Sequence, residues 1–266
     1  MTFVLKDRWA LITGASSGIG AALARELASR GTHCILVARR QRELDGLAKE
    51  LSGQFKVEAK AIALDLTHPD AVSTLLGHIL ELPVSVLVNN AGVGVTGPFH
   101  MGDPEALSRM IQLNVCFMMQ LTHAMWTTLA GCEQGSRILN VGSIAGAQGV
   151  PHMAAYAATK AFVNHLSQGL TFEQPAHSKL RITCLMPGKT ESEFFDVAGM
   201  RNSRFVSSNV MSPRDVARIG IDAMVKGKAQ VVAGWLNRLS VWSGRFSPTW
   251  LLRWTMRHLF RDMGVN

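Results

Sequence analysis

Short apolar runs alternate with longer amphipathic stretches along most of the chain. Several of these runs contain continuous apolar stretches, as in strands that are covered on both faces. Seven runs predict strands, at residues 9–13, 33–38, 57–64, 85–89, 136–142, 180–186 and 229–233. The stretches between them predict helices, at residues 18–30, 41–52, 69–81, 105–130, 154–174 and 213–226. Strands that alternate with helices indicate the α/β class, here a doubly wound parallel sheet of about seven strands with helices on both faces.

The length and composition favour one domain. A chain of 266 residues is long enough to bury a sizeable core, and 47% of its residues are hydrophobic. The sequence contains no internal repeat, low-complexity tract or linker. We therefore expect a single domain over residues 1–266, with residues 235–266 as a basic, tryptophan-rich helical extension of it.

The cysteines and the N-terminal segment bear on the cellular compartment. Cys34, Cys116, Cys132 and Cys184 form no CxxC pair and lack metal-ligand spacing, which favours free thiols in a reducing compartment. The N-terminal segment has no signal-peptide pattern, and no run of about 18 apolar residues appears. We expect a cytoplasmic protein that binds no metal.

A glycine-rich segment, "TGASSGIG", follows the first predicted strand and opens the first predicted helix. Glycines allow a tight turn and a close approach to a pyrophosphate, and the helix N-terminus offers unpaired N–H groups. A tight strand–helix turn without a ligand is the alternative, but the position after the first strand favours a nucleotide site. We expect cofactor contacts here from Gly14, Ser16, Ser17, Gly18, Ile19 and Gly20.

Two arginines follow the second predicted strand, where an NAD-binding unit would place an acid. No Asp or Glu occurs between Gly31 and Arg42, and the strand is followed by Arg39 and Arg40. A solvated basic turn is the alternative. However, both arginines precede a helix N-terminus, where the macrodipole disfavours cations unless an anion is bound. Because a guanidinium suits a 2′-phosphate, the pair favours NADP over NAD as the cofactor.

Tyr156 is the only tyrosine in the chain, and Lys160 follows it by four residues in a predicted helix. Residues at this spacing share one face of a helix. Seen alone, such a pair is typical of a solvated helix surface. Here Ser143 also lies at the end of the preceding predicted strand, so a hydroxyl, a phenol and an ammonium are candidates for one site.

These groups suit acid–base chemistry beside a nicotinamide. A free tyrosine has a pKa of about 10, which is too high for efficient catalysis near neutrality. Lowering it by about three units needs about 4 kcal/mol, which a close ammonium in a water-poor cleft, together with an oxidised nicotinamide, can supply. We therefore expect Lys160 to lower the pKa of Tyr156, which exchanges a proton with the substrate, while Ser143 holds the substrate oxygen.

Taken together, these segments resemble the short-chain dehydrogenase/reductase family, of the single-domain type with a Rossmann fold. The resemblance covers roughly residues 5 to 233. It rests, in family order, on "TGASSGIG" (13–20), "LDL" with Asp65, "NNAG" (89–92), Asn114 in "QLNV", Ser143, "YAATK" (156–160) and "PG" (187–188).

The resemblance implies roles for the matched residues. Tyr156 would be the acid/base, and Lys160 would lower its pKa and bind the nicotinamide ribose. Ser143 would orient the carbonyl or alcohol. Asn114 would hold a water that links Lys160 to bulk solvent.

The resemblance also implies further cofactor contacts. Asp65 would hydrogen-bond the adenine, and Asn89 would border the cofactor. Other contacts are expected from Leu66, Ala91, Gly92, Tyr156, Lys160, Pro187 and Gly188. The family often has a Thr four residues beyond the Pro-Gly glycine, which holds the carboxamide. Ser192 takes that position in this chain, and Thr190 lies near it, so either hydroxyl is a candidate.

Three segments would surround the nicotinamide end of the site, namely residues 93–100, 145–153 and 191–212. The last contains apolar side chains, at Phe194, Phe195, Met200, Phe205 and Met211. Such residues suit an apolar substrate, although they would also suit a lid packed against the domain.

The charge is concentrated near the C-terminus. Residues 201–266 hold 11 Lys and Arg against three Asp, so the whole excess of +8 lies there, beside four of the six tryptophans. We predict a helix from Ser247 and Pro248, with Arg253, Arg257 and Arg261 in one stripe bordered by Trp250 and Trp254. A subunit contact or a core-packed helix is one interpretation of this tail. The other is peripheral contact with an anionic membrane.

The sequence therefore favours an NADP-dependent oxidoreductase acting on a carbonyl/alcohol pair, with a carbonyl reductase of an apolar ketone or aldehyde as its specific form. NADPH in cells usually drives reduction. The alternatives are a non-catalytic NADP-binding regulator and a peripheral membrane platform on the same fold. We expect a homodimer or homotetramer, and no nucleic-acid partner, because no nucleic-acid fold accompanies the basic tail.

Overall fold

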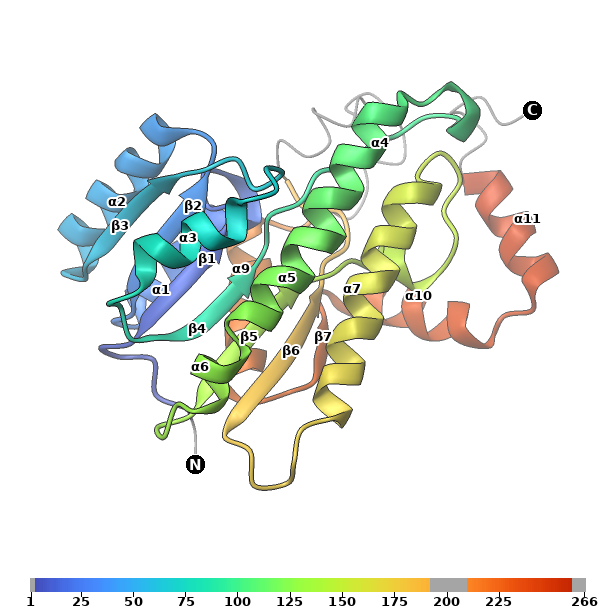
Figure 1. Cartoon of the computed structure of the whole chain (residues 1–266). Helices are drawn as coiled ribbons and strands as arrows, with labels where there is room; N and C mark the ends of the chain where they lie inside the picture. Colours follow the sequence, from blue (N-terminus) through green and yellow to red (C-terminus); the bar gives the residue numbers. More distant parts are fainter. Residues whose placement is uncertain (1–2, 192–209, 260–266) are drawn as a thin grey trace.

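The computed structural model describes residues 3–191 and 210–259. These residues form a seven-stranded parallel sheet in the order β3-β2-β1-β4-β5-β6-β7 (Figure 1). The strands are β1 (Trp9–Thr13), β2 (His33–Ala38), β3 (Ala59–Ala63), β4 (Val84–Asn89), β5 (Ser136–Val141), β6 (Leu180–Met186) and β7 (Gln230–Val232). The order reverses between β1 and β4, and in such sheets ligands bind at the carboxyl ends of the strands beside this point. The predicted doubly wound parallel sheet is confirmed.

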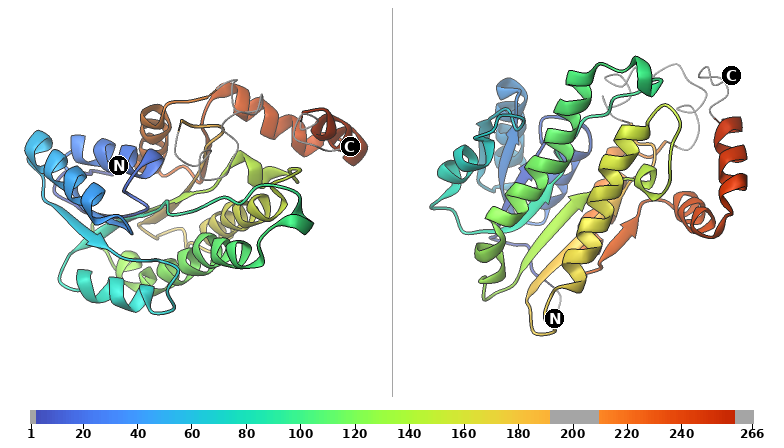
Figure 2. Two further views of the ribbon diagram at one scale, coloured as in Figure 1. Left: turned by 90° about the horizontal axis from the view of Figure 1, so that it is seen from above. Right: turned by 45° about the vertical axis from the view of Figure 1, so that its right-hand side comes forward.

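Helices cover both faces of the sheet. In the view from above, α1, α2 and α9 lie on one side of the sheet, and α3, α5 and α7 on the other (Figure 2). The α-helices are α1 (Gly18–Ser29), α2 (Gln41–Phe55), α3 (Ala71–Ile79), α4 (Pro104–Ile111), α5 (Met118–Ala124), α6 (Trp126–Ala130), α7 (Ala154–Phe172), α9 (Pro213–Val225), α10 (Trp235–Phe246) and α11 (Thr249–Leu259). Shorter turns are the 3-10 helices η1 (Phe99–Met101) and η3 (Ile144–Ala147), and the π-helix η2 (Gln112–Phe117) joins α4 to α5.

The core has two parts, one on each face of the sheet. Because side chains alternate along a strand, Ala10 and Ile12 of β1 pack with α1, α2 and α9, while Leu11 packs with α3 and α5. All three side chains are fully buried. Because both faces are covered, the central strands carry apolar residues at successive positions and lack the apolar–polar alternation of a strand with one exposed face.

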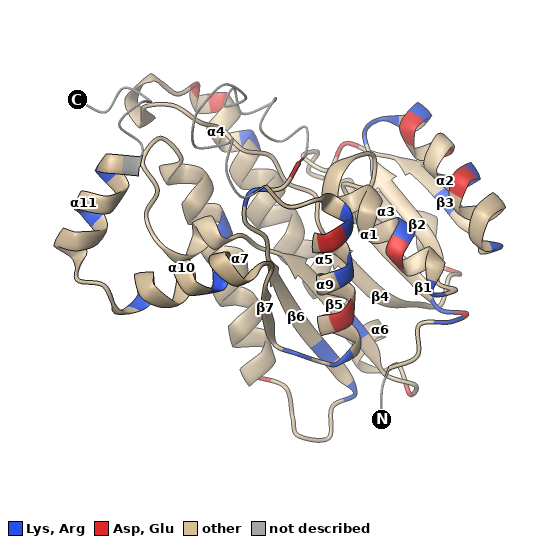
Figure 3. Cartoon of the chain, turned by 180° about the vertical axis from the view of Figure 1, so that it is seen from behind, with Lys and Arg blue, Asp and Glu red and all other residues tan. Residues whose placement is uncertain are grey.

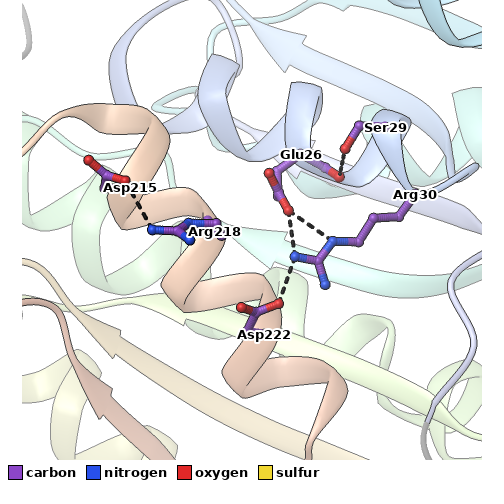
Figure 4. Close-up of polar contacts among 6 residues, drawn as sticks. All are labelled: Glu26, Ser29, Arg30, Asp215, Arg218 and Asp222. Carbon is purple, nitrogen blue, oxygen red and sulfur yellow. Dashed lines mark hydrogen bonds and ion pairs between the residues drawn. The ribbon is translucent and has the colours of Figure 1, made fainter.

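An ion pair joins α1 to α9, which lie on the same side of the sheet. Arg30, which follows α1, donates to Glu26 on α1 and to Asp222 on α9, the latter at 2.7 Å (Figure 4). Arg218 on α9 pairs with Asp215 one turn earlier, at 3.2 Å. Of these pairs, Arg30–Asp222 links the end of α1 to α9, and because its groups are partly exposed it contributes little to the free energy of unfolding.

Residues 105–130, which the sequence predicts as one helix, form α4, η2, α5 and α6 instead. In η2 the hydrogen bonds widen to i→i+5, and the π-helix contains Asn114. A single wide turn hardly changes the apolar periodicity, so the sequence pattern does not reveal it. Such π-helical segments occur frequently at functional sites.

The sequence predicts a helical tail over residues 235–266 but gives a start signal only for the second of its two described helices. We expected a helix from Ser247, but α10 precedes that point and α11 follows it. Gly234, with φ 90°, turns the chain out of β7, and α10 begins without a side-chain cap, so it lacks the usual start signal. Among the described residues, no helix is both long and apolar enough to cross a bilayer.

Candidate active site

A cavity of about 1380 Å³ lies at the carboxyl ends of the strands. The chain reaches it from the turn after β1, the ends of β2 to β6, the start of α7, and the two tail helices. Of the predicted site residues, those that line it are Gly14, Ser16, Ser17, Gly18, Ile19, Gly20, Arg39, Arg40, Asp65, Leu66, Ala91, Gly92, Ser143, Tyr156, Lys160, Pro187, Gly188 and Thr190. Most of the sequence-predicted residues thus meet in one place.

The glycine-rich turn is packed so closely that a side chain at either of two of its glycines would force neighbouring atoms to shift. A Cβ on Gly20 would lie 2.1 Å from the carbonyl oxygen of Gly14, and a Cβ on Gly14 would lie 2.8 Å from Cα of Ala91. Gly14 also has φ +67°, which favours glycine. At Gly14 and Gly20 the turn therefore presents only backbone atoms to the cavity.

Asn90 holds this turn in place, and the sequence analysis missed it. Its Nδ2 donates to the carbonyl oxygens of Thr13, at 2.9 Å, and Gly14, at 3.1 Å. Asn89, which we expected to border the cofactor, is instead buried and donates to Thr122 and Asn140, both at 2.9 Å. Asn89 does not line the described cavity. Successive residues at a strand end point to opposite sides, and this rule could have identified Asn90.

The basic end of the cavity lies beside the glycine-rich turn. Arg40 donates from Nη2 and Nε to Oγ of Ser16, at 3.1 and 3.3 Å, which brings its guanidinium over the turn. Asp65 accepts hydrogen bonds from the backbone N–H and hydroxyl of Thr67. These bonds hold the pKa of Asp65 below its usual value, and the charge of Arg39 lowers it further. The cavity end therefore carries two exposed guanidinium groups and one ionised carboxylate.

Tyr156, Lys160 and Ser143 meet at the opposite end of the cavity. Tyr156 lies in the first turn of α7, is buried, and is hydrogen-bonded to Ser143. Lys160 Nζ is 6.0 Å from the centre of the Tyr156 ring and donates to the carbonyl oxygen of Val141 at 2.8 Å. Ser143 Oγ also accepts from the N–H of Ala145 at 3.0 Å, which fixes its position at the start of η3.

Burial, not the ammonium, dominates the pKa of Tyr156. We expected Lys160 to lower this pKa, but burial raises it to about 12, and the hydrogen bond with Ser143 lowers it only in part. Burial likewise lowers the pKa of Lys160 to about 8. Desolvation of a buried phenol disfavours the phenolate. The lowering that we expect from Lys160 together with an oxidised nicotinamide therefore stays a prediction for the enzyme with its cofactor bound.

Asn114 lies behind the cavity wall and connects three segments. Its Nδ2 donates to the carbonyl oxygen of Val93, at 2.9 Å, and to Oγ1 of Thr159, at 3.1 Å, and its Oδ1 accepts from the N–H of Val93. A Cβ on Gly92 would lie 3.1 Å from this Oδ1 and 3.5 Å from Nζ of Lys160. Gly92 therefore leaves a space beside both groups, although Asn114 does not itself line the described cavity.

The end of β6 supplies the last expected contacts. Thr190 is buried, lines the cavity, and donates to the carbonyl oxygen of Gly188 at 3.2 Å. Ser192 lies outside the described residues, as do Phe194, Phe195, Met200 and Phe205. Of the two candidate hydroxyls, the structure therefore places only that of Thr190.

Apolar side chains surround the phenol of Tyr156. It packs with the buried Met110 and Met153 and with Val93, Val95 and Val150. The tail helices add further cavity residues that the sequence analysis missed, namely Leu236, Asn237, Ser240 and Val241 from α10 and Met256 and His258 from α11. Among the described residues, no three His, Cys, Asp or Glu side chains lie close enough to hold a metal ion.

Comparison with known proteins identifies the family. The short chain dehydrogenase model matches residues 8–203. Very-long-chain 3-oxoacyl-CoA reductase-B of Danio rerio is 37% identical over 170 residues, which cover 62% of this chain and 54% of the relative. An uncharacterized oxidoreductase of Staphylococcus saprophyticus is 30% identical over 222 residues, 83% of this chain and 92% of that one. This chain thus spans about half the length of the named reductases that it matches.

Solved structures agree with the sequence matches. A short-chain dehydrogenase from Sphingobium yanoikuyae in complex with NADPH has a TM-score of 0.78 and 31% identity, over 90% of this chain and 93% of that one. The bulky-bulky ketone specific alcohol dehydrogenase from Comamonas testosteroni has a TM-score of 0.75 and 26% identity, over 97% of this chain and 95% of that one. The protein belongs to the short-chain dehydrogenase/reductase family.

Proposed function

We propose that the protein is an NADP-dependent oxidoreductase that transfers hydride between the nicotinamide and a carbonyl/alcohol pair, acting as a reductase of an apolar ketone or aldehyde. The observation that carries this proposal is the buried Tyr156, hydrogen-bonded to Ser143 and one turn before Lys160, in the cavity that begins at the glycine-rich turn.

The residues present fit the dinucleotide. The glycine-rich turn lines the cavity at the N-terminus of α1, where unpaired N–H groups would bind the pyrophosphate. Arg40, held by Ser16, and Arg39 would bind the 2′-phosphate. Asp65 would contact the adenine, and the hydroxyl of Thr190 or Ser192 would contact the carboxamide. The bound cofactor supplies the hydride.

The side chains at the other end would move the proton. A phenol with a pKa of about 12 is protonated near neutral pH, so Tyr156 is already in the acid form that reduction requires. Ser143 would hold the substrate oxygen beside this phenol. As Tyr156 gives up its proton, the ammonium of Lys160 would stabilise the phenolate, and Asn114 would position a water beside Lys160 for reprotonation.

Two observations support an apolar substrate. The cavity wall around Tyr156 is made of valine and methionine side chains, which suit an apolar group next to the reacting carbonyl. Relatives are named as very-long-chain 3-oxoacyl-CoA reductases and as a bulky-bulky ketone specific alcohol dehydrogenase. We therefore place a ketone on a long or bulky apolar chain first among the candidates, with a 3-oxoacyl thioester as one form of it.

A panel of ketones and aldehydes with chains of increasing length tests the proposal. NADPH consumption, followed as loss of nicotinamide absorbance, should rise in kcat/KM with chain length, because each buried methylene contributes about 0.8 kcal/mol. NADPH binding without turnover of any compound would contradict the proposal. It would favour the alternative, a non-catalytic NADP-binding regulator.

A further inference from the structure

One face of α10 carries a continuous row of apolar side chains in solvent. Its members follow one another at spacings of four, three and four residues, so they share one side of the helix. The row consists of Trp235, Leu239, Trp242 and Phe246, which are 72%, 54%, 64% and 69% exposed. We call this set the apolar stripe. Trp250 and Trp254 on α11 are also exposed.

The opposite face of α10 is fixed to the body of the protein. Asn237 donates to the carbonyl oxygen of Ala233 at 2.6 Å, and α10 packs on β7 and on η3, the turn that follows Ser143. A Cβ on Gly244 would lie 2.6 Å from Oε1 of Gln148, so the helix is in close contact there. The apolar stripe is therefore the outer face of an anchored helix, and an exposed row of this size marks an interaction site.

The charge around the stripe defines the partner. The sequence contains no Asp or Glu between Asp222 and Asp262. The cations in this interval are Lys226, Lys228, Arg238, Arg245, Arg253, Arg257 and Arg261. Figure 3 shows α10 and α11 with basic residues and without acidic ones. A second copy of the chain that met this face symmetrically would bring like charges together, which disfavours a dimer through the stripe.

We propose that the apolar stripe and its flanking arginines dock the protein on an anionic membrane surface. Tryptophan favours the level where apolar and wet regions meet, and arginine pairs with anionic headgroups. Leu236 and Val241, on the other side of α10, line the cavity. The docking helix is thus also a wall of the active-site cavity, which places the cavity beside the lipid.

This arrangement deepens the proposed function and, for substrate delivery, depends on it. A ketone on a long apolar chain dissolves in the bilayer and not in water, so an enzyme docked beside the cavity wall would draw it from the membrane. Docking itself needs no turnover and can be tested separately.

Flotation of the full-length protein with vesicles tests the docking. Vesicles of phosphatidylglycerol and phosphatidylcholine should bind the protein at low salt, and pure phosphatidylcholine vesicles or high salt should weaken binding. The charge variant Arg238→Gln with Arg245→Gln should bind about 25-fold more weakly, since each cation near an anionic leaflet strengthens binding about fivefold. The matched control, Arg42→Gln with Lys49→Gln on α2, should bind as the wild type does.

A second pair of variants tests the stripe. Trp235→Gln with Trp242→Gln should weaken binding more than tenfold, because both rings would lose their contact with lipid. The control, Leu80→Gln with Phe172→Gln, changes apolar residues elsewhere that are at least as exposed, and it should have no effect. Size-exclusion chromatography with light scattering should give the same oligomeric state for all variants.

Three results would overturn the proposal. These are no binding to anionic vesicles at low salt, equal losses in the stripe variants and their controls, or a stripe variant that lowers the oligomeric state, which would assign the stripe to a second copy. Reduction of a short, water-soluble ketone by the stripe variants should equal that of the wild type. If flotation succeeds and no ketone is reduced, the proposed function fails while the docking stands.

Discussion

Replacing Arg40 with serine should shift the cofactor preference from NADPH toward NADH. Hydrogen bonds of 3.1 and 3.3 Å from Arg40 to Ser16 hold the guanidinium over the glycine-rich turn. Because the cation is already in position, its contact with a 2′-phosphate should contribute about 1.5–3 kcal/mol. Its loss should lower kcat/KM with NADPH by about 10- to 150-fold. NADH lacks the phosphate, so its kcat/KM should change by no more than a few-fold.

The double variant Arg39→Asp with Arg40→Ser should go further. It removes both cations and installs a carboxylate that can accept hydrogen bonds from the ribose hydroxyls, as NAD-binding units do. Steady-state kinetics with both cofactors and one ketone would measure the change. Arg42→Ser is the matched control, since Arg42 is an exposed cation on α2 that does not line the described cavity.

Two outcomes would refute this reasoning. The wild type could use NADH and NADPH with equal kcat/KM, in which case no 2′-phosphate contact operates. Alternatively, Arg40→Ser and Arg42→Ser could change the NADPH/NADH ratio by the same factor, which would show a general effect of charge and not a specific contact.

Further predictions concern the ammonium, the glycine-rich turn and the helix contact. The kcat/KM of reduction should fall as the pH rises through about 8, where Lys160 gives up its charge. Lys160→Met should have a kcat/KM lower by roughly 100-fold or more, and its pH profile should lack this fall. Gly20→Ala should lower the free energy of unfolding, measured in urea, by more than about 3 kcal/mol, because the added Cβ would lie 2.1 Å from a backbone oxygen. Gly46→Ala on α2, with open space around it, should raise the free energy of unfolding by about 0.5–1 kcal/mol. Asp222→Ala should lower the free energy of unfolding by less than about 1 kcal/mol, and high salt should remove this difference from the wild type. A larger loss that does not depend on salt would contradict the assignment of Arg30 and Asp222 to a surface ion pair.

Much of the fold was predictable because its signals are local. The central strands contain continuous apolar stretches. The prolines at 104 and 213 each follow a residue that caps the helix, Asp103 and Ser212. The glycine-rich turn was predictable for the same reason, since its backbone geometry requires glycine whatever the rest of the chain does.

The remainder depends on contacts between distant segments. The π-helical turn at Asn114 leaves the apolar pattern nearly unchanged, so one long helix was the simpler prediction. The part that α10 plays in the cavity wall depends on its packing against η3, which no local pattern encodes. The burial that raises the pKa of Tyr156 also depends on such contacts, because the proximity of a charge can be guessed from spacing, whereas burial cannot.

The central claim is that Tyr156 is the proton donor of an NADPH-dependent reductase. The variant Tyr156→Phe removes only the phenolic oxygen, so its NADPH affinity, measured by nicotinamide fluorescence, should stay within about threefold of the wild type. Its single-turnover rate of ketone reduction should fall by about 100- to 10,000-fold, the usual contribution of a positioned general acid. A rate within a few-fold of the wild type, with the same pH profile and intact NADPH binding, would contradict the claim.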